Sequence, residues 1–445
     1  MIWNVENKVT GASGVRQLNY WVIESLLDTD LYKYTMLLVY FEKHVNDVAT
    51  FEFKCRNDIV YTEEMTAEIN RQLDYLCELH ISEAEISFLR AMDFMGGDGK
   101  NRGFFEFLRM YRLRRECVKV ELIEGGKLSV ISEGPIFFAS MFETFVLSIV
   151  GEVYYRFTLS EEQYLEALDA GERKLYDKIA RLKDEIARGR LVGDKPFKLS
   201  DMGARRRFSF EFHKFVAETL NAEFSGERLL FTGTSDIHLA RLVGVKAIGT
   251  MAHEFLCTGQ GLDRVPVMRS QKHMLEEWLE VFRSQLGIAL SDNLGFKKFM
   301  RDCDRLLAMA FSGFRHDSGD PFAWGEQLIA WLESMSIDPL TKDAIFSDSL
   351  NFDKAVEIFN YFIEKINAGF GIGTYLTCDM SGGVTALQNV MKVVEVNYRP
   401  VAKLSDDNGK TMCRDKRYVD YMYEQMADEE KRVRRQSDEH TLRIR

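Results

Sequence analysis

The sequence predicts an α/β protein whose second half forms a barrel-like parallel sheet, and two observations lead to this prediction. From Phe197 onward, short apolar runs alternate with amphipathic helical stretches in a regular order. This alternation is typical of parallel strands joined by crossover helices. About seven strand–helix units fit into roughly 200 residues, which favours a barrel over a long open sheet. Periodicity alone does not decide whether the sheet closes.

The expected elements of the barrel follow one another closely along the chain. The strand-like runs are residues 197–200, 229–232, 245–248, 287–290, 311–314, 344–347 and 368–372. The helical stretches between them include residues 206–220, 296–309, 324–335 and 352–366.

The two ends of the chain have a different pattern. Residues 49–54 and 118–123 alternate like half-buried strands, and residues 390–397 and 399–404 do the same around a turn at Asn397-Tyr398. We therefore expect three parts. They are an N-terminal α/β domain (1–160), a barrel-like βα domain (161–380) that opens with a long charged helix at 161–190, and C-terminal strands and a tail (381–445) that pack back on the N-terminal domain.

Composition excludes several classes of protein. The net charge of -11 disfavours nucleic-acid binding, which needs a basic surface. The 7 cysteines are scattered without a C-x-x-C pair, as in a reduced cytoplasmic protein without a zinc site. The start of the sequence does not resemble a signal peptide. The apolar stretch 136–150 contains Glu143 and is shorter than the ~20 residues of a membrane span, so we expect a buried helix and no membrane association.

Polar and glycine residues collect where the predicted barrel strands end. Parallel α/β sheets place their ligands at this end, in the loops that lead to the helices. The segments concerned are residues 201–205, 233–236, 249–253, 291–293, 315–320, 347–349 and 371–374. A purely structural barrel would not need such residues after nearly every strand, so we expect a functional site there.

His253 follows one of these strands. A single histidine is more often structural than catalytic, but this one shares its end of the sheet with Asp201, Asp292, Asp317 and Asp348. A carboxylate that accepts from one ring nitrogen leaves the other nitrogen available as a nucleophile or base. These residues favour a catalytic role for His253.

Two glycine-containing segments predict either anion binding or plain turns. In residues 231–236 (FTGTSD), a strand ends and a helix begins, so the free N–H groups and hydroxyls suit an anion, while Ser235 or Asp236 suits a helix N-cap. In residues 370–374 (FGIGT), backbone can approach a phosphate closely, although a tight turn explains the glycines equally well.

Two basic segments follow predicted strands. Residues 315–321 (RHDSGDP) contain Asp320 and Pro321 as the start of a helix, which leaves Arg315 and Asp317 without a structural explanation. Arg315 suits a carboxylate or phosphate, and Asp317 suits ribose hydroxyls or magnesium. Of the consecutive arginines 205–207, at most one or two can face the site, and Arg205 is the candidate; a solvated basic turn is the alternative.

Together, these motifs resemble the nicotinate phosphoribosyltransferase family, over nearly the whole chain. In order and spacing the likeness is specific, although several segments are weak alone. The segments are residues 27–36 (LDTDLYKYTM), 53–57 (FKCRN), 203–209 (GARRRFS), 233–235 (GTS), 249–254 (GTMAHE), 315–321 (RHDSGDP), 370–374 (FGIGT) and 400–405 (PVAKLS).

The resemblance implies a fold and a reaction. The fold is an irregular barrel of the type II phosphoribosyltransferase kind, with an α/β domain built from both ends of the chain. The reaction joins nicotinate to phosphoribosyl pyrophosphate, giving nicotinate mononucleotide and pyrophosphate for NAD salvage, coupled to ATP hydrolysis. Magnesium accompanies the pyrophosphate or ATP, and no protein metal site is expected. The protein is expected to be a cytoplasmic homodimer with shared active sites.

The resemblance also assigns residues. His253 matches the transiently phosphorylated histidine, and with Asp292 and Asp317 it forms the expected catalytic set. Tyr32 matches an aromatic residue that stacks on the pyridine ring from the neighbouring subunit; the alternative is a core tyrosine on a helix capped by Asp28. The remaining substrate-binding candidates are Arg205, Ser235, Thr250, Arg315, Gly373 and Thr374. Met202 stands where related nicotinamide enzymes usually carry an aromatic residue.

Ser235 separates two branches of related enzymes. Enzymes for nicotinamide resemble Gly-Thr-Asp at this strand end, and that carboxylate accepts from the amide. Ser235 instead can donate to a nicotinate carboxylate, which an aspartate would repel. The alternatives are a nicotinamide enzyme, a quinolinate enzyme, which would need more cationic groups, and an inactive family member, against which His253, Asp292, Arg315 and Asp317 argue together.

Overall fold

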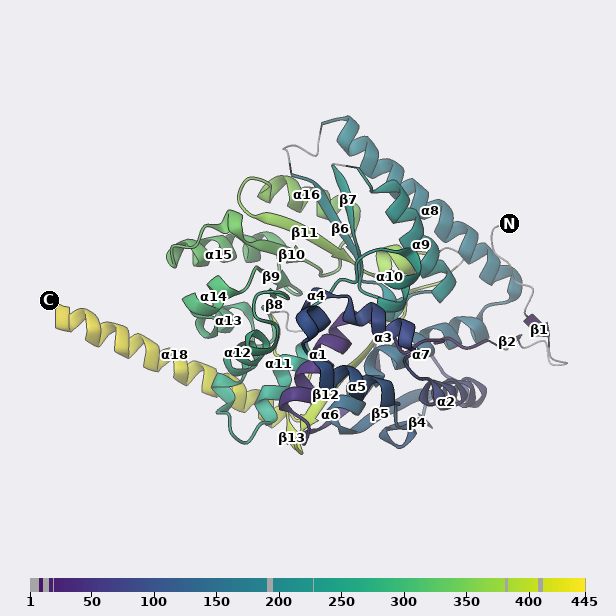
Figure 1. Ribbon diagram of the computed structural model, residues 1–445, viewed down its shortest axis with the longest axis horizontal. Helices are drawn as coiled ribbons and strands as arrows, with labels where there is room; N and C mark the ends of the chain where they lie inside the picture. Colours follow the sequence, from purple (N-terminus) through teal and green to yellow (C-terminus); the bar gives the residue numbers. More distant parts are fainter. Residues whose placement is uncertain are drawn as a thin grey trace.

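The computed structural model describes residues 8–10, 16–18, 20–189, 195–226, 228–380, 383–406 and 411–444. Its core contains two large sheets, one parallel and one antiparallel (Figure 1). The parallel sheet has the strand order β7-β6-β11-β10-β9-β8, and the antiparallel sheet has the order β13-β12-β3-β5-β4. The predicted α/β class, with a barrel-like sheet and a second sheet built from both ends of the chain, is confirmed.

The strands of the parallel sheet are β6 (Phe197–Asp201), β7 (Leu229–Thr234), β8 (Ile288–Leu290), β9 (Gly313–His316), β10 (Asp343–Phe346) and β11 (Asn367–Ile372). Those of the antiparallel sheet are β3 (Val48–Cys55), β4 (Val118–Ile123), β5 (Lys127–Pro135), β12 (Asn389–Val396) and β13 (Arg399–Pro400). A small separate pair consists of β1 (Lys8–Thr10) and β2 (Arg16–Leu18).

The helices of the first part are α1 (Leu31–Lys43), α2 (Glu63–Glu78), α3 (Glu83–Arg90), α4 (Asp93–Gly96), α5 (Arg102–Met110), α6 (Ile136–Ala139), α7 (Phe142–Thr158) and α8 (Glu161–Ala187). Those of the second part are α9 (Phe210–Glu223), α10 (Ile237–Val243), α11 (His253–Thr258), α12 (Ser270–Phe282), α13 (Phe296–Asp302), α14 (Arg305–Ala310), α15 (Pro321–Ser334), α16 (Phe352–Phe362), α17 (Thr374–Thr377) and α18 (Lys416–Ile444).

The parallel sheet is irregular between its edge strands β7 and β8. The run 245–248 was expected to be a strand, but it forms only an isolated parallel bridge, between Ala247 and Thr234. The backbone N–H of Ile248 donates to Thr234 O at 2.8 Å, and the Thr250 hydroxyl donates to Ile288 O of β8 at 2.7 Å. A few hydrogen bonds therefore connect this segment to both edge strands, where a full strand would form a regular ladder.

Several predicted boundaries are wrong, and local capping explains two of them. The helix expected at 206–220 begins at Phe210, because the Ser209 hydroxyl accepts from the Phe212 N–H. The helix expected at 296–309 breaks into α13 and α14, because Asp304 caps the second one. Strand β9 begins at Gly313 and not at Phe311, so Arg315 lies on a strand and not on a loop.

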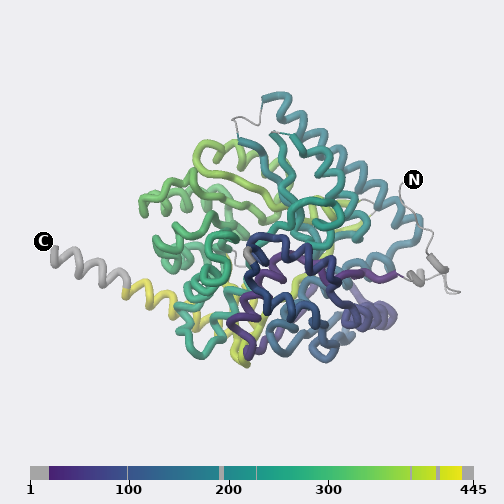
Figure 2. Tube along the Cα trace, viewed as in Figure 1, coloured from purple at the N-terminus to yellow at the C-terminus, as the bar shows by residue number. Residues whose placement is uncertain are grey.

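The antiparallel sheet joins the two ends of the chain as expected. Strand β12 pairs with β3 along residues 389–396, and Figure 2 shows these C-terminal strands beside the N-terminal part of the chain. Asn397 and Tyr398 have φ values of 50° and 62°, which is the left-handed conformation of a two-residue hairpin turn. The predicted turn is confirmed.

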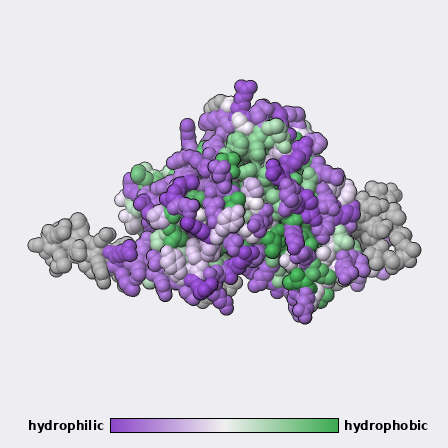
Figure 3. Space-filling view, turned by 90° about the horizontal axis from the view of Figure 1, so that it is seen from below, coloured by the Kyte–Doolittle hydropathy of each residue, from purple (hydrophilic) through white to green (hydrophobic). Residues whose placement is uncertain are grey.

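Helix α7 is the core of the N-terminal part. In the described part of the chain, residues 136–158 are the one helical stretch long and apolar enough to cross a membrane, with a mean hydropathy of 1.7. However, 94% of that stretch's apolar window is buried inside the protein. The stretch is a core helix, as predicted. The face of the protein that Figure 3 shows mixes hydrophilic and hydrophobic side chains.

Candidate active site

The first cluster of the candidate site is centred on His253, the first residue of α11. Its Nε2 lies 2.8 Å from Oδ1 of Asp292, which follows β8. Since Nε2 faces a carboxylate, it carries the ring proton, and Nδ1 keeps its lone pair. Burial, helped by the charge of Lys403, lowers the pKa of His253 to about 4 against the opposing effect of Asp292. The imidazole is therefore neutral at physiological pH.

Asp292 is held at both carboxylate oxygens. Besides the bond to His253, its Oδ2 accepts from the Ser318 hydroxyl at 2.7 Å and lies 3.1 Å from Lys403 Nζ. Burial alone would raise the pKa of Asp292, but His253 and Lys403 outweigh it and hold the pKa well below its usual range. Asp292 is thus a fixed anion that orients the ring of His253.

Asp317 completes this cluster and faces the open side of the site. Its Oδ2 lies 3.8 Å from His253 Nε2, its Oδ1 accepts from the Ser347 hydroxyl at 3.1 Å, and 29% of its side chain is exposed. Burial would raise its pKa, but the Arg315 guanidinium lowers it, so Asp317 is also an anion. It is the carboxylate of the cluster that a ligand can reach.

The same three residues are a poor resident metal site. Ligand atoms of His253, Asp292 and Asp317 lie within 4.8 Å of one another. However, Asp292 already receives a lysine ammonium and a hydroxyl, and Nε2 of His253 is turned toward that carboxylate with its proton. A divalent cation would have to displace Lys403 and deprotonate or turn the imidazole.

Arg315 lies on β9, two residues before Asp317. Its Nε is buried and has no hydrogen-bond partner among the described residues. A buried donor without a partner is costly, and an anionic ligand is one way to satisfy it. The position therefore fits the predicted role of Arg315 as a clamp for a carboxylate or phosphate.

The second cluster surrounds Arg205. Its Nε lies 3.1 Å from Asp30 Oδ2, its guanidinium carbon lies 5.6 Å from the centre of the Tyr32 ring, and 34% of its side chain is exposed. The charge of Asp317 acts on Arg205 and on Arg206, so the two clusters border the same region.

Tyr32 packs against the barrel of its own chain. The preceding residue, Leu31, donates its N–H to Ser235 O at 2.8 Å, and Thr35 donates its hydroxyl to Thr250 O at 2.6 Å. The Tyr32 hydroxyl is buried without a partner among the described residues. The expected Asp28 cap is wrong, since Asp30 precedes the helix. Sequence distance from the barrel is therefore no reason to place Tyr32 in a neighbouring subunit, and the shared site stays a prediction.

Ser235 is nearly buried, and its hydroxyl is already engaged. It donates to Asp30 Oδ1, while Asp236, not Ser235, caps α10 by accepting from the Leu239 N–H. A nicotinate carboxylate would therefore meet the Ser235 hydroxyl only if that bond to Asp30 opened. Asp30 was missed by sequence reasoning, although it lies in the segment 27–36 that carries the resemblance.

The three consecutive arginines have three different roles. Arg207 is fully buried and binds both Asp28 oxygens and Glu152 Oε1, the latter at 2.9 Å. Arg206 donates to Asn389 O at 3.1 Å. Burial, together with its cationic neighbours, lowers the pKa of Arg206 to about 10. Arg205 is the one bound to Asp30 beside Tyr32, so of the three arginines it lies next to another candidate residue, and its role in substrate binding stays a prediction.

Met202 packs against the glycines at the end of β11. An added Cβ on Gly371 would lie 2.3 Å from Met202 Sδ, so the thioether packs directly on this glycine. Gly373 and Thr374 follow, at the start of α17, and are half-buried. Met202 thus covers the strand that leads to the predicted phosphate-contacting residues.

Two carboxylates named from the sequence do not join the His253 cluster. Asp201 is buried and binds His213 Nε2, the Thr234 hydroxyl and the Gly203 N–H, so it fixes the end of β6. Asp348 accepts from the Ser349 hydroxyl at 3.1 Å.

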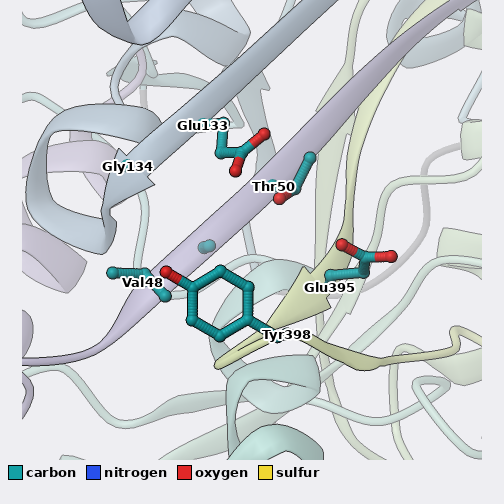
Figure 4. A pocket seen from close by; sticks show the side chains of 7 residues that line it. Val48, Thr50, Glu133, Gly134, Glu395 and Tyr398 are labelled. Carbon is teal, nitrogen blue, oxygen red and sulfur yellow. The ribbon is translucent and has the colours of Figure 1, made fainter.

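A hollow of about 40 Å³ lies on the antiparallel sheet (Figure 4). It is bordered by Val48, Thr50, Glu133 and Tyr398, and none of the candidate residues lines it.

Comparisons with known proteins show the family of the chain. The N-terminal domain model of the nicotinate phosphoribosyltransferase (NAPRTase) family matches residues 27–151, and the model of the family itself matches residues 197–430. The chain is 41% identical over 412 residues to nicotinate phosphoribosyltransferase of Acinetobacter baumannii, covering 92% of this chain and 98% of the relative. It is 40% identical to the Neisseria gonorrhoeae protein of the same name, covering 90% and 96%.

Solved structures of similar proteins share the fold. The crystal structure of nicotinate phosphoribosyltransferase from Vibrio cholerae has a TM-score of 0.83 and 34% identity, covering 91% of this chain and 94% of that one. The structure from Porphyromonas gingivalis has a TM-score of 0.80 and 30% identity, covering 91% and 100%.

Proposed function

Because the chain belongs to the nicotinate phosphoribosyltransferase family and is a phosphoribosyltransferase by that membership, we propose that it couples nicotinate mononucleotide synthesis to ATP hydrolysis through a phosphohistidine at His253. The substrates are nicotinate, phosphoribosyl pyrophosphate, ATP and water. The products are the mononucleotide, pyrophosphate, ADP and phosphate. We assign this reaction to NAD salvage in the cytoplasm.

The observation that carries the proposal is the pairing of a neutral His253 with the fixed anion Asp292. Nδ1 of His253 attacks the γ-phosphorus of ATP, an N–P bond forms, and the bond from that phosphorus to the ADP oxygen breaks. Asp292 stabilises the positive charge that develops on the ring, because its Oδ1 accepts from Nε2–H at 2.8 Å. Water later takes the phosphoryl group and frees the ring.

In the glycosyl transfer, the pyridine nitrogen attacks the anomeric carbon and the carbon–oxygen bond to pyrophosphate breaks. The chain's contribution is positioning and charge. We place the pyridine ring beside Tyr32 and Arg205, with Arg315 and Thr250 bordering its carboxylate. We place the phosphoribosyl group at Gly373 and Thr374, with Asp317 toward its hydroxyls. Magnesium enters as a complex with the phosphate substrates.

Labelling tests the phosphohistidine. Incubation with γ-labelled ATP should give an acid-labile, base-stable label on the protein, and His253→Ala should lack it. His273→Ala is the matched control, because His273 lies on α12 and pairs with Glu277. Unchanged labelling of His253→Ala would overturn the proposal.

The identity of the base needs a separate test. We propose nicotinate because Arg205 and Arg315 supply positive charge where an anionic base is expected. Product analysis with nicotinate and with nicotinamide, each with and without ATP, should show mononucleotide mainly from nicotinate and more of it with ATP. Equal or greater turnover of nicotinamide would instead favour the nicotinamide enzyme, with Asp30 as the carboxylate that accepts from the amide.

We also propose a homodimer whose subunits share active sites, as the family resemblance implies. Tyr32→Ala and His253→Ala proteins, each inactive, should recover some activity when their subunits exchange. Complete inactivity after proven exchange would indicate that each chain holds a whole site.

A further inference from the structure

The segment 401–406, here called the strap, crosses from the antiparallel sheet to the barrel after β13. Its Ala402 exchanges two hydrogen bonds with the Gln260 side chain, at 2.9 and 2.8 Å. Leu404 then donates its N–H to Asn293 O at 2.9 Å, directly beside Asp292. The strap is thus fixed against the loop that carries the partner of His253.

The far end of the strap is also anchored. The Asp406 carboxylate accepts from the Phe296 N–H, at 3.0 Å to each oxygen, at the start of α13. The Asp406 N–H faces Ser318 Oγ at 3.4 Å, and Ser318 is the hydroxyl that binds Asp292. The backbone of Lys403 forms a two-bond bridge with Met412. Lys403 is therefore presented by a segment held on both sides.

Lys403 reaches the carboxylate that orients His253. Its Nζ lies 3.1 Å from Asp292 Oδ2, and its side chain is only 10% exposed. The opposite oxygen, Oδ1, faces His253. Lys403 and Ser318 together occupy one oxygen of Asp292 and leave the other for the imidazole.

From this geometry we infer that Lys403 is a positioning residue for phosphoryl transfer to His253: it holds Asp292 in the orientation that directs Nδ1 of His253 toward ATP. The inference rests on the proposed phosphohistidine and extends it to a residue of the C-terminal part of the chain. It also gives the strap a function, which is to tie the C-terminal segment to the chemistry of the barrel.

The loss of Lys403 affects Asp292 and His253 in two ways. Without the ammonium, Asp292 has one donor fewer on Oδ2 and can rotate away from Nε2, which slows the transfer. The charge of Lys403 also disfavours a positive charge on the ring. This keeps the resting His253 neutral but opposes the charge that develops during the transfer, so a slower Lys403→Met reports the lost orientation of Asp292. Neither effect acts on nicotinate, which we place at Arg205 and Arg315.

The experiment compares two reactions of the same variants. Lys403→Met should lower the single-turnover rate of protein labelling from γ-labelled ATP by at least about tenfold, the loss expected from a charge-assisted hydrogen bond. Its ATP-independent synthesis of mononucleotide at saturating substrate should stay within about threefold of the wild type. Lys403→Arg, which keeps the charge and the hydrogen bond, should restore most of the labelling rate.

Arg399→Met is the matched control, because Arg399 precedes the strap and is an exposed cation paired with Asp263. It should leave both reactions unchanged. Labelling of Lys403→Met at the wild-type rate would overturn the inference while leaving the phosphohistidine intact. Equal loss of both reactions together with a lower Tm would reduce Lys403 to a structural role. Absence of label from the wild type would overturn the phosphohistidine itself, and the inference with it.

Discussion

Replacing Asp292 with Asn is the sharpest perturbation of the proposed mechanism. The two side chains have nearly the same shape, so the change removes charge and alters hydrogen bonding without opening a cavity. Asp292 is 1% exposed and accepts from His253, Ser318 and Lys403. An asparagine has one oxygen for three donors, and its NH2 group must face one of them.

The magnitude follows from these contacts. The bond to Nε2 is charge-assisted when the ring becomes positive during phosphoryl transfer, and such a bond typically contributes about 1.5–3 kcal/mol. Each 1.4 kcal/mol changes a rate by about tenfold, so the loss of this bond alone predicts a roughly 10- to 150-fold slower transfer. If the amide turns its NH2 toward His253, the ring proton moves to Nδ1 and the nucleophile is blocked, so the loss is larger.

Rapid-quench labelling with γ-labelled ATP measures this step directly. Asp292→Asn should label at least about tenfold more slowly than the wild type. Far-UV circular dichroism and Tm identify a variant that has simply unfolded. A folded Asp292→Asn protein that labels within about threefold of the wild-type rate would refute the assignment of Asp292 as the group that orients His253.

Three further predictions concern pH, base selection and stability. Since the pKa of His253 is lowered to about 4, labelling at saturating magnesium–ATP should lose rate through protonation of the ring only as the pH falls toward 4; a loss through His253 protonation centred near 6.5 would contradict this environment. Ser235→Asp places a second carboxylate against Asp30 and near the substrate carboxylate, so kcat/KM should fall at least about tenfold for nicotinate and less for nicotinamide, and equal losses would count against selection at this position. Arg207→Met leaves buried acids unpaired, so urea unfolding should show a loss of about 3–5 kcal/mol, against about 0.5 kcal/mol or less for the exposed control Arg188→Met.

The sequence predicted the strands that have a regular apolar pattern and missed those that do not. Six of the seven barrel strands predicted from apolar runs are strands of the parallel sheet. The seventh run, 245–248, does not form a strand. It makes a single parallel bridge, between Ala247 and Thr234. Strand β5 was not predicted, since residues 127–135 combine one glycine, one proline and one acidic residue with a few apolar ones. These residues form a strand because they pair with β3 on one side and with β4 on the other.

The sequence predicted which candidate residues lie near one another better than it predicted their contacts. His253, Asp292, Asp317 and Arg315 were chosen because they end or follow parallel strands, and strand ends meet in space whatever lies between them in the sequence. Lys403 and Asp30 were missed, although both lie in segments that carry the family resemblance. Their positions depend on tertiary contacts of the strap and of the turn before α1, which no local pattern reveals.

The limit of sequence reasoning is clearest in a comparison of the chain's two buried histidine–aspartate pairs. His213 donates its Nε2–H to Asp201, and His253 donates its Nε2–H to Asp292, so the two pairs have the same chemistry, and both acids lie at the ends of apolar runs. The side chain of His213 is fully buried, so its Nδ1 is closed to a ligand. The ring of His253 is 7% exposed and lies beside the 29% exposed carboxylate of Asp317. A histidine can transfer a phosphoryl group only if its second nitrogen can meet a ligand. Pairing with a carboxylate is therefore necessary for the proposed role but does not establish it, and access to Nδ1 is the property that distinguishes His253 from His213.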